Sequence, residues 1–181
     1  NSEWTAEIAY WAARRKERLE AEGRLSSLPL KPQRVYAEIR KVMPRDAIVA
    51  LDAGLAPNFG QDRLEFYEPR SLLTSLDLGG LGFSFPASLG AKFAAPHRPV
   101  VNFNGDGGFL FNAQELDTAV RYGLKVITVI MNNGCWGSEK AYQRYAFNER
   151  YVGADTTNPR YDKYAELFGA TGFYVERAED I

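Results

Sequence analysis

The chain has 181 residues, of which 45% are apolar and 25% charged, so we expect one folded domain of ordinary size and not a disordered chain. A net charge of -1 gives no electrostatic reason to expect nucleic acid or a membrane as a partner, and no apolar stretch approaches the ~20 residues that span a bilayer. A single cysteine excludes an internal disulfide, which is typical of a reducing compartment, and we expect the cytoplasm.

The first part of the chain is predicted to be helical. Residues 2–22 carry a charged helical pattern that ends at Gly23. A Ser- and Pro-rich link over residues 26–32 then leads to a second helix over residues 32–42, with a proline in its first turn. The first of these helices is expected to be peripheral.

Three short apolar runs predict buried strands, over residues 47–51, 99–103 and 126–131. They do not alternate with polar residues, and helical patterns separate them, which is typical of a parallel sheet covered on both faces. A fourth strand is expected over residues 173–175. The predicted fold class is therefore α/β, a doubly wound parallel sheet with helices on both faces.

Two of the intervening helices have recognisable ends. One is expected over residues 112–122, between the second and third strands, with Asn112 as its N-cap. The other follows the third strand, with Asn158 as its cap, Pro159 in its first turn and Gly169 at its end.

Each of the three strands runs into a loop rich in Gly, Asn or Asp at its C-terminal end, the edge where open α/β sheets bind ligands. After the second strand comes Gly105-Asp106-Gly107-Gly108, whose glycines are expected to free the backbone so that successive N–H groups form a nest for an anion. A carboxylate repels a phosphate unless a cation lies between them. The loop therefore predicts Mg²⁺ together with a phosphate group.

The other half of this predicted site follows the third strand, where Asn133 stands in an Asn-Asn-Gly turn. A right-handed crossover makes Asp106 and Asn133 neighbours on adjacent strands. Asp106 would then supply charge, the Asn133 side chain a neutral oxygen, and the main-chain carbonyl of Cys135 a third ligand for the ion.

The pattern Gly105-Asp106-Gly107, a spacer and then a double Asn resembles the signature of the thiamine-diphosphate-dependent enzymes of the acetolactate synthase type. The resemblance implies thiamine diphosphate and Mg²⁺ as cofactors, with Asp106, Asn133 and the carbonyl of Cys135 as metal ligands. It also implies an enzyme that forms or cleaves C–C bonds of 2-oxo acids.

Two further segments resemble the same family. In the Gly-rich segment 79–87, the resemblance implies that the Gly79 carbonyl accepts a bond from the cofactor's aminopyrimidine and that Leu81 wedges the cofactor into its bent form. Residues 52–56 resemble the loop that meets the diphosphate from the other side, without the polar residues found there in acetolactate synthases. The cofactor-binding residues implied are Gly54, Leu55, Gly79, Gly80, Leu81, Gly105, Asp106, Gly107, Gly108, Asn133, Cys135 and Trp136; no catalytic residue is assigned.

The family resemblance extends from about residue 32 to the C-terminus and gives the chain half of an active site. In the family a separate pyrimidine-binding domain supplies an activating glutamate, so we expect that domain as a partner across a homodimer or homotetramer interface, with a small-molecule substrate. Residues 1–31 are expected to be a helix and linker from a preceding domain, and residues 32–181 the diphosphate-binding domain, shortened at its C-terminus. We expect the isolated piece to be inactive.

Alternative interpretations stay open. The segment from Trp136 to Lys140 resembles the sulfoacetaldehyde acetyltransferase branch of the family. A nucleotide-binding module is a different class, but the loop lacks the third glycine and the Lys-Ser/Thr of nucleotide fingerprints. A degenerate, non-enzymatic partner domain is a third, against which the intact metal ligands argue. Trp136 and Tyr142 either line a substrate cleft or only pack, and His97 is interpreted as a surface residue.

Overall fold

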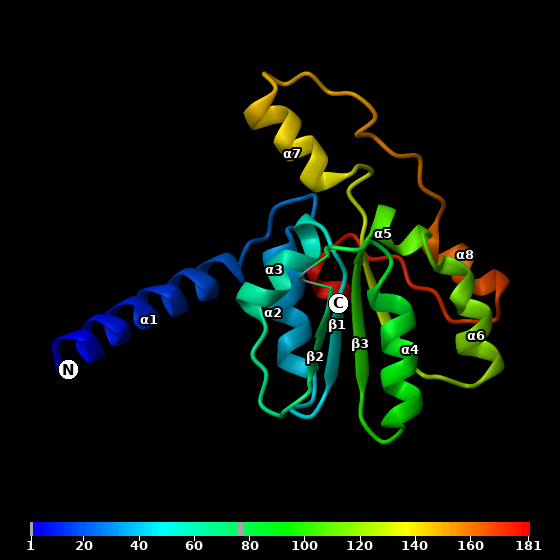
Figure 1. The fold of residues 1–181 in the computed structure, drawn as a ribbon, viewed down its shortest axis with the longest axis horizontal. Coiled ribbons are helices and arrows are strands. Elements are labelled where there is room, and N and C mark those ends of the chain that lie inside the picture. Colours follow the sequence, from blue (N-terminus) through cyan, green and yellow to red (C-terminus); the bar gives the residue numbers. More distant parts are fainter. Residues whose placement is uncertain (1, 76–77) are drawn as a thin grey trace. The chain divides into compact units, whose positions relative to one another are not determined.

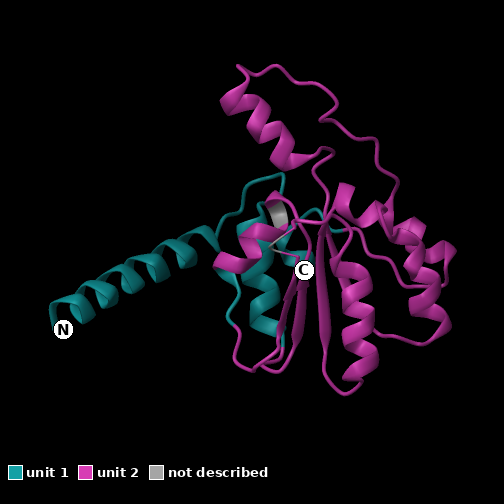
Figure 2. Cartoon of the chain, viewed as in Figure 1, with its two compact units in different colours: residues 1–43, 63–65, 175–181 teal, residues 44–62, 66–174 magenta. Residues whose placement is uncertain are grey.

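The structure is a computed structural model that describes residues 2–75 and 78–181, and the chain divides into two compact units (Figure 2). Unit 1 comprises residues 1–43, 63–65 and 175–181, and unit 2 comprises residues 44–62 and 66–174. None of the described helices combines the length and the apolar character needed to cross a membrane.

Unit 1 contains α1 (Ser2–Glu22), α2 (Pro32–Val42) and the short 3-10 helix η2 (Ala178–Asp180) (Figure 1). α1 and α2 have the bounds predicted from the sequence. Trp4 and Trp11 of α1 are 65% and 59% exposed, so its apolar residues find no core among the described residues. α2 buries Tyr36 completely.

Unit 2 is built on a parallel sheet of four strands in the order β2-β1-β3-β4. The strands are β1 (Ile48–Leu51), β2 (Leu72–Thr74), β3 (Val100–Gly105) and β4 (Ile127–Met131). The three apolar runs of the sequence are confirmed as the strands β1, β3 and β4, and with them the α/β fold class. The predicted burial holds for β1 and for β3 up to its last residue, but it is wrong for β4, where Ile127 is 64% exposed and the other residues are partly buried. The strand β2 was not predicted, because three partly buried residues make too short a pattern to recognise.

The fourth strand predicted from the sequence, over residues 173–175, is wrong. These residues have no regular structure and pair with no strand of the described sheet. Phe173 is 81% exposed and Tyr174 is 53% exposed. Aromatic and β-branched residues favour a strand only where a neighbouring strand receives them, and no described strand does so here. The Tyr174 ring instead lies under the Arg160 guanidinium, whose carbon is 3.9 Å from the ring centroid.

The order of the strands explains where a ligand site forms. From β1 the chain passes to β2 on one side, then crosses to β3 on the other side of β1, so the connection changes direction between β1 and β3. In open α/β sheets this switch point leaves a crevice outside the C-terminal ends of the strands. Those ends lead into Asp52 and Asp106, at the upper edge of the sheet in Figure 1.

The helices after the strands are α3 (Leu55–Arg63), α4 (Ser84–Ala94), α5 (Asp106–Leu110), the 3-10 helix η1 (Ala113–Glu115), α6 (Leu116–Arg121), α7 (Gly137–Ala146) and α8 (Tyr161–Leu167). Residues of α4, α5, η1 and α6 share a buried apolar core, against which partly buried residues of α8 pack. Its centre includes Phe85 and Phe109, whose ring centroids are 5.3 Å apart. Burying one such ring contributes roughly 1.5–3 kcal/mol, so this core fixes α5 and hence Asp106, its first residue.

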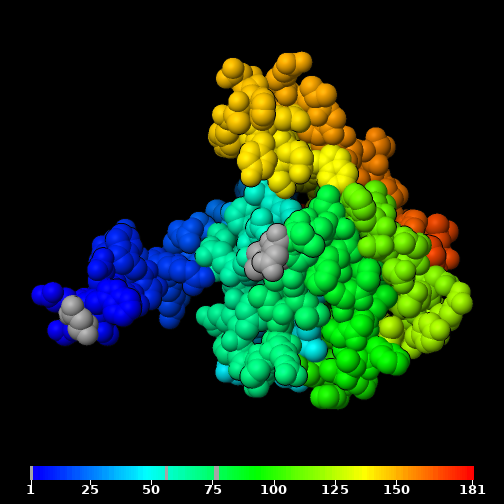
Figure 3. Space-filling view, viewed as in Figure 1, coloured from blue at the N-terminus to red at the C-terminus, as the bar shows by residue number. Residues whose placement is uncertain are grey.

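α7 and the segment after it are much less buried. Of the described residues in α7, none is buried, and Tyr142 and Tyr145 are 69% and 83% exposed. In the space-filling view the segment coloured yellow to orange forms a lobe at the edge of unit 2 (Figure 3). The Tyr142 side chain therefore does not pack in the core of this unit.

Asn112 occupies the predicted N-cap position but makes no side-chain cap bond, and the cap predicted at Asn158 is wrong. The helix expected over residues 112–122 begins as η1, with Asn112 at its N-cap position, and continues as α6. The Asn112 Nδ2 donates to the carbonyl of Gly82 at 2.8 Å, and the side chain makes no bond to the N–H groups of the first turn. Arg160 immediately precedes α8, while the Asn158 side chain reaches a carboxylate described below. Short polar side chains can bond either to nearby main-chain groups or to distant partners, and here both asparagines bond to distant partners.

Candidate functional site

The register between β3 and β4 brings two polar segments together. Gly105, the last residue of β3, pairs with Met131, the last residue of β4. The next residues, Asp106 and Asn132, therefore leave neighbouring strands at the same edge of the sheet. Asp106 is only 2% exposed, so its carboxylate lies inside this junction.

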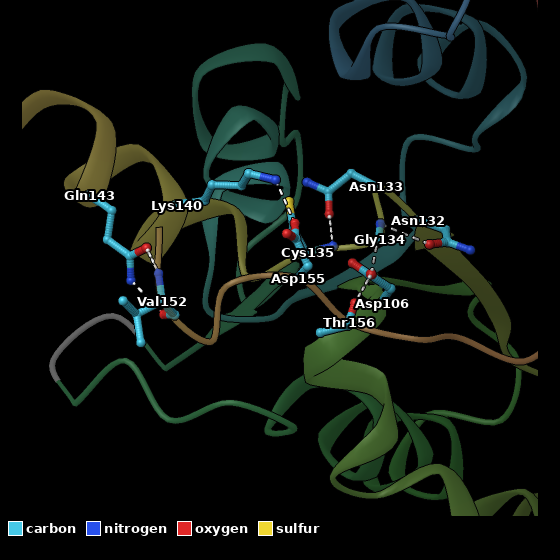
Figure 4. A network of polar contacts seen from close by, with 10 residues as sticks. All are labelled: Asp106, Asn132, Asn133, Gly134, Cys135, Lys140, Gln143, Val152, Asp155 and Thr156. Atoms are coloured by element: carbon cyan, nitrogen blue, oxygen red, sulfur yellow. Dashed lines mark hydrogen bonds and ion pairs between the residues drawn. The ribbon is translucent and has the colours of Figure 1, made fainter. Parts of the chain in front are cut away.

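One oxygen of the Asp106 carboxylate is fully engaged with the protein (Figure 4). Its Oδ2 accepts hydrogen bonds from the Gly134 N–H at 3.1 Å, the Thr156 hydroxyl at 3.3 Å and the Asn158 Nδ2 at 2.6 Å. Among the described residues, no donor contacts Oδ1. The carboxylate is thus held through one oxygen, while the other has no protein donor.

The two asparagines that follow β4 have different partners. The Asn132 Oδ1 accepts from the Gly134 N–H at 3.2 Å and from the Asn158 Nδ2 at 2.9 Å. In the part of the chain that the structure describes, the Asn133 Oδ1 accepts only the Cys135 N–H, at 3.1 Å, so one of its two lone pairs stays available. Gly134 has φ +67°, which a residue without Cβ adopts at little cost, and this turn aims its N–H at Asp106.

An antiparallel bridge fixes the main chain after this turn. Cys135 pairs with Asp155, and the Trp136 N–H donates to the Ala154 carbonyl at 2.7 Å. The Lys140 ammonium lies 2.5 Å from the Asp155 carboxylate (Figure 4). Burial raises the pKa of the Cys135 thiol, so at neutral pH the side chain is a neutral thiol and a poor nucleophile.

The glycines beside Asp106 do not form the predicted nest. Gly105 has φ -77° and ψ 161°, and neither Gly107 nor Gly108 has a positive φ, because α5 begins at Asp106 itself. The expectation that these glycines adopt conformations closed to other residues is therefore wrong.

Two of these glycines are required for space instead. A Cβ on Gly107 would stand 2.6 Å from the Trp136 ring. A Cβ on Gly108 would stand 2.2 Å from the Asp52 Oδ2. Both distances are far below van der Waals contact, so a ring and a carboxylate pack directly onto the backbone of α5.

Asp52, the residue after β1, is a second buried carboxylate at this edge, 1% exposed. Its Oδ2 accepts the Gly82 N–H at 3.1 Å and its Oδ1 accepts the Ser84 N–H at 3.3 Å. Gly82 has φ +80°, and the Asn112 side chain binds its carbonyl. Burial raises the pKa of Asp52, and the N–H donors oppose that rise without cancelling it.

The loops after β1 and β4, and the Gly-rich segment, approach one another. A Cβ on Gly137 would lie 3.2 Å from the Asn133 Nδ2 and 3.5 Å from the Leu55 Cβ. A Cβ on Gly108 would lie 3.8 Å from the Leu81 Cδ2. Most residues that the family resemblance implicated therefore gather at the C-terminal edge of one sheet.

Gly54, Gly79 and Gly80 have fewer close neighbours than Gly107 and Gly108. Gly54 and Gly79 have φ +123° and φ +59°, conformations that favour glycine. Gly79 and Gly80 are exposed, and no described atom comes within 4 Å of a Cβ built on either. Their neighbours at positions 76 and 77 lie outside the described residues.

Three polar side chains of this site were not identified from the sequence as part of it. Asn158 was interpreted as a helix cap, Thr156 was not singled out, and the Tyr161 hydroxyl donates to the main-chain carbonyl of Asp106 at 3.0 Å. Burial and then the charge of Asp106 raise the pKa of Tyr161, so its hydroxyl remains a donor. The available signal was a polar run before α8, and such a run equally predicts a plain turn.

Acidic and thiol side chains are sparse here. No group of three or more His, Cys, Asp or Glu side chains that could hold a metal ion occurs within residues 2–75 and 78–181.

Comparison with known proteins gives consistent matches. The family model described as "Thiamine pyrophosphate enzyme, C-terminal TPP binding domain" matches residues 52–181. The chain is 34% identical over 182 residues to a sulfoacetaldehyde acetyltransferase of Castellaniella defragrans, with 98% of this chain and 30% of that protein covered. It is 36% identical over 172 residues to the acetolactate synthase large subunit IlvG of Mycobacterium tuberculosis, with 95% of this chain and 31% of that protein covered.

A solved structure agrees with these relatives. The thiamine diphosphate-dependent 4-hydroxybenzoylformate decarboxylase of Rhodococcus jostii superposes with a TM-score of 0.80 at 28% identity, covering 86% of this chain and 29% of that one. The chain spans about 30% of the length of the curated relatives it matches. It belongs to the thiamine pyrophosphate enzyme family and carries the C-terminal cofactor-binding domain of that family over residues 52–181.

Proposed function

We propose that Asp106, Asn133 and the main-chain carbonyl of Cys135 hold a Mg²⁺ ion that carries the diphosphate of thiamine diphosphate. The observation that carries this proposal is the Oδ1 of Asp106, a residue 2% exposed, whose carboxylate is bonded through Oδ2 alone among residues 2–75 and 78–181. Asn133 offers the spare lone pair of its Oδ1. One carboxylate oxygen, one amide oxygen and one carbonyl are the hard ligands that Mg²⁺ prefers.

The charge of the site supports a cation between protein and diphosphate. No Lys or Arg forms an ion pair with Asp106 among the described residues. A diphosphate brought against this carboxylate alone would be repelled, by about 4 kcal/mol for unit charges 4 Å apart at an effective dielectric constant of 20. A divalent ion between the two groups would attract both the carboxylate and the diphosphate. The oxygen ligands of this site therefore support a bound cation.

The remaining residues fit the rest of the cofactor. Leu81, whose side chain reaches toward α5, would hold the cofactor in its bent form, and the Gly79 carbonyl would accept a bond from the aminopyrimidine. Gly54, Gly80 and Leu55 would line the approach from the β1 side. When bound, thiamine diphosphate supplies a nucleophilic carbon that adds to a carbonyl and then stabilises the resulting negative charge. The role of this chain is to anchor and orient the cofactor.

We propose further that residues 32–181 are the diphosphate-binding domain of a longer enzyme. That enzyme would form or cleave C–C bonds of 2-oxo acids, as an acetolactate synthase does, in the cytoplasm. Its pyrimidine-binding domain would come from a second subunit in a homodimer or homotetramer. The similarity to sulfoacetaldehyde acetyltransferases supports a second candidate activity within the same class.

The experiment is a calorimetric titration of the full-length protein with thiamine diphosphate, with Mg²⁺ present or chelated, and with NAD and ATP as comparison ligands. We expect Mg²⁺-dependent binding of thiamine diphosphate alone. Equal binding with and without Mg²⁺, or preference for a nucleotide, would refute the site. Consumption of a 2-oxo acid compared with consumption of sulfoacetaldehyde separates the two activities.

A further inference from the structure

Two side chains from one segment converge on a single oxygen of the site. Thr156 and Asn158, in the segment between α7 and α8, both donate to the Asp106 Oδ2, at 3.3 Å and 2.6 Å. They come from 50 and 52 positions further along the chain than Asp106. The Asn158 bond is the shorter of the two side-chain bonds.

The orientation of the Asn158 amide follows from its neighbours. The Gly134 N–H donates both to the Asp106 Oδ2 and to the Asn132 Oδ1, so both of these atoms are acceptors. The Asn158 atom that faces both of them must therefore be the donor, Nδ2. The price is an Oδ1 of Asn158 that is buried with no partner in the described structure, which is unfavourable unless the bonds to the acceptors outweigh it.

These side-chain bonds are not needed to attach the segment. The Thr156 N–H already donates to the Gly134 carbonyl at 2.9 Å, and the Ala154 carbonyl already accepts the Trp136 N–H at 2.7 Å. Main-chain bonds thus hold residues 154–156 beside the turn after β4. The side chains of Thr156 and Asn158 instead restrain the carboxylate.

We propose that Asn158 and Thr156 are positioning residues for the metal-binding carboxylate. By saturating Oδ2 together with the Gly134 N–H, they fix the rotation of the Asp106 carboxyl group and leave Oδ1 as the oxygen for the ion. Asn158 also links Asp106 to Asn132 and so sets the distance between the ends of β3 and β4. This inference rests on the proposed Mg²⁺ site and adds to it the segment that carries Thr156 and Asn158.

The test measures the Kd of Mg²⁺ in the full-length protein at saturating thiamine diphosphate. Removing an outer partner of a ligand typically lowers metal affinity ~10–100-fold, which we expect for Asn158→Ala, with a loss of roughly 3–10-fold for the isosteric Thr156→Val. Thr156→Ser keeps the hydroxyl, and Thr157→Val changes an exposed neighbour, so both should stay within about twofold of the parent protein. Excess Mg²⁺ should restore cofactor binding to Asn158→Ala, as it would not for a misfolded variant.

The outcomes separate this inference from the proposal on which it rests. If the parent protein shows no Mg²⁺-dependent binding, the proposed site fails. If Asp106→Asn loses Mg²⁺ affinity while Asn158→Ala and Thr156→Val bind Mg²⁺ like the parent, the site stands and the positioning role is overturned. Where Asn158→Ala does not fold, the isosteric Thr156→Val decides alone, and parental Mg²⁺ affinity in that variant overturns the inference.

Discussion

The two buried carboxylates at the C-terminal edge of the sheet are used in opposite ways. Asp52 follows β1 and Asp106 follows β3, and they are 1% and 2% exposed. Both oxygens of Asp52 accept main-chain N–H groups, from Gly82 and Ser84. Asp106 gives one oxygen to three donors and leaves the other without a protein donor among the described residues.

The difference shows that burial alone does not identify a ligand. A carboxylate with both oxygens satisfied by backbone is part of the fold, and here Asp52 fastens β1 to the start of α4. A carboxylate that is oriented through one oxygen and open at the other is prepared for a partner from outside the chain. The following predictions exchange or remove these features, and the largest expected effect comes first.

Replacing Asp106 with Asn should abolish most of the metal affinity with little loss of stability. An Asn side chain can keep its oxygen toward the three donors, while its amide takes the place of the oxygen that would bind the ion. We expect the Kd of Mg²⁺ to rise ~100–1000-fold, about 3–4 kcal/mol, and the free energy of unfolding to change by less than about 1 kcal/mol. Calorimetry and urea unfolding measure the two; a large loss of stability would make Asp106 structural, like Asp52.

Replacing Gly108 with Ala should destabilise unit 2, because the new Cβ would stand 2.2 Å from the Asp52 Oδ2. Overpacking of this kind costs roughly 1–3 kcal/mol. Gly105→Ala is the matched control, since Gly105 has φ -77° and no described atom lies within 4 Å of a Cβ built on it. Chemical denaturation should show the loss only for Gly108→Ala, and equal losses would contradict the steric account.

Replacing Asp52 with Asn should reverse the pattern expected for Asp106→Asn. The amide would turn a donor toward either the Gly82 or the Ser84 N–H, and one buried N–H would lose its acceptor. We expect the free energy of unfolding to fall by about 1–3 kcal/mol, with the Kd of Mg²⁺ changed less than about threefold. Unchanged stability together with a large loss of Mg²⁺ affinity would place the metal site on the wrong carboxylate.

The smallest expected effect is the contribution of Asp52 to the pH dependence of the free energy of unfolding. Burial raises the pKa of Asp52 in the folded state, so between its ordinary value near pH 4 and the raised value the folded state binds more protons than the unfolded state. The free energy of unfolding therefore falls as pH rises through this window, by about 1.4 kcal/mol for each pKa unit. Subtracting the curve of Asp52→Asn from that of the parent isolates this slope; an increase with pH would contradict the raised pKa.

The sequence predicted the parts of the fold that depend on local pattern. β1 is a run of buried apolar residues, β3 starts with buried apolar residues, β4 is an apolar run that is only partly buried, and α2 begins at a proline, so composition and period identify them. The neighbourhood of Asp106 and the double Asn was also predictable, because two parallel strands joined by one right-handed crossover end at the same edge. The three residues of β2 gave no such pattern.

What the sequence did not predict depends on partners that are distant along the chain. Asn158 and Asn112 have a residue type that favours helix caps, but only Asn112 lies at a cap position, and the folded structure offers both side chains acceptors elsewhere, at Asp106 and Gly82. The glycines that flank Asp106 were expected to allow backbone conformations that other residues rarely adopt. Their steric role at Gly107 depends on the Trp136 ring, which packs there only after folding.

The most direct test is a crystal structure of the full-length protein with Mg²⁺ and thiamine diphosphate. The account predicts an ion at ~2.0–2.1 Å from the Asp106 Oδ1 and from the Asn133 Oδ1, with the Asn158 Nδ2 still bonded to Oδ2. An ion bound through Oδ2 with Asn158 displaced, or a diphosphate seated elsewhere with no ion on Asp106, would contradict it.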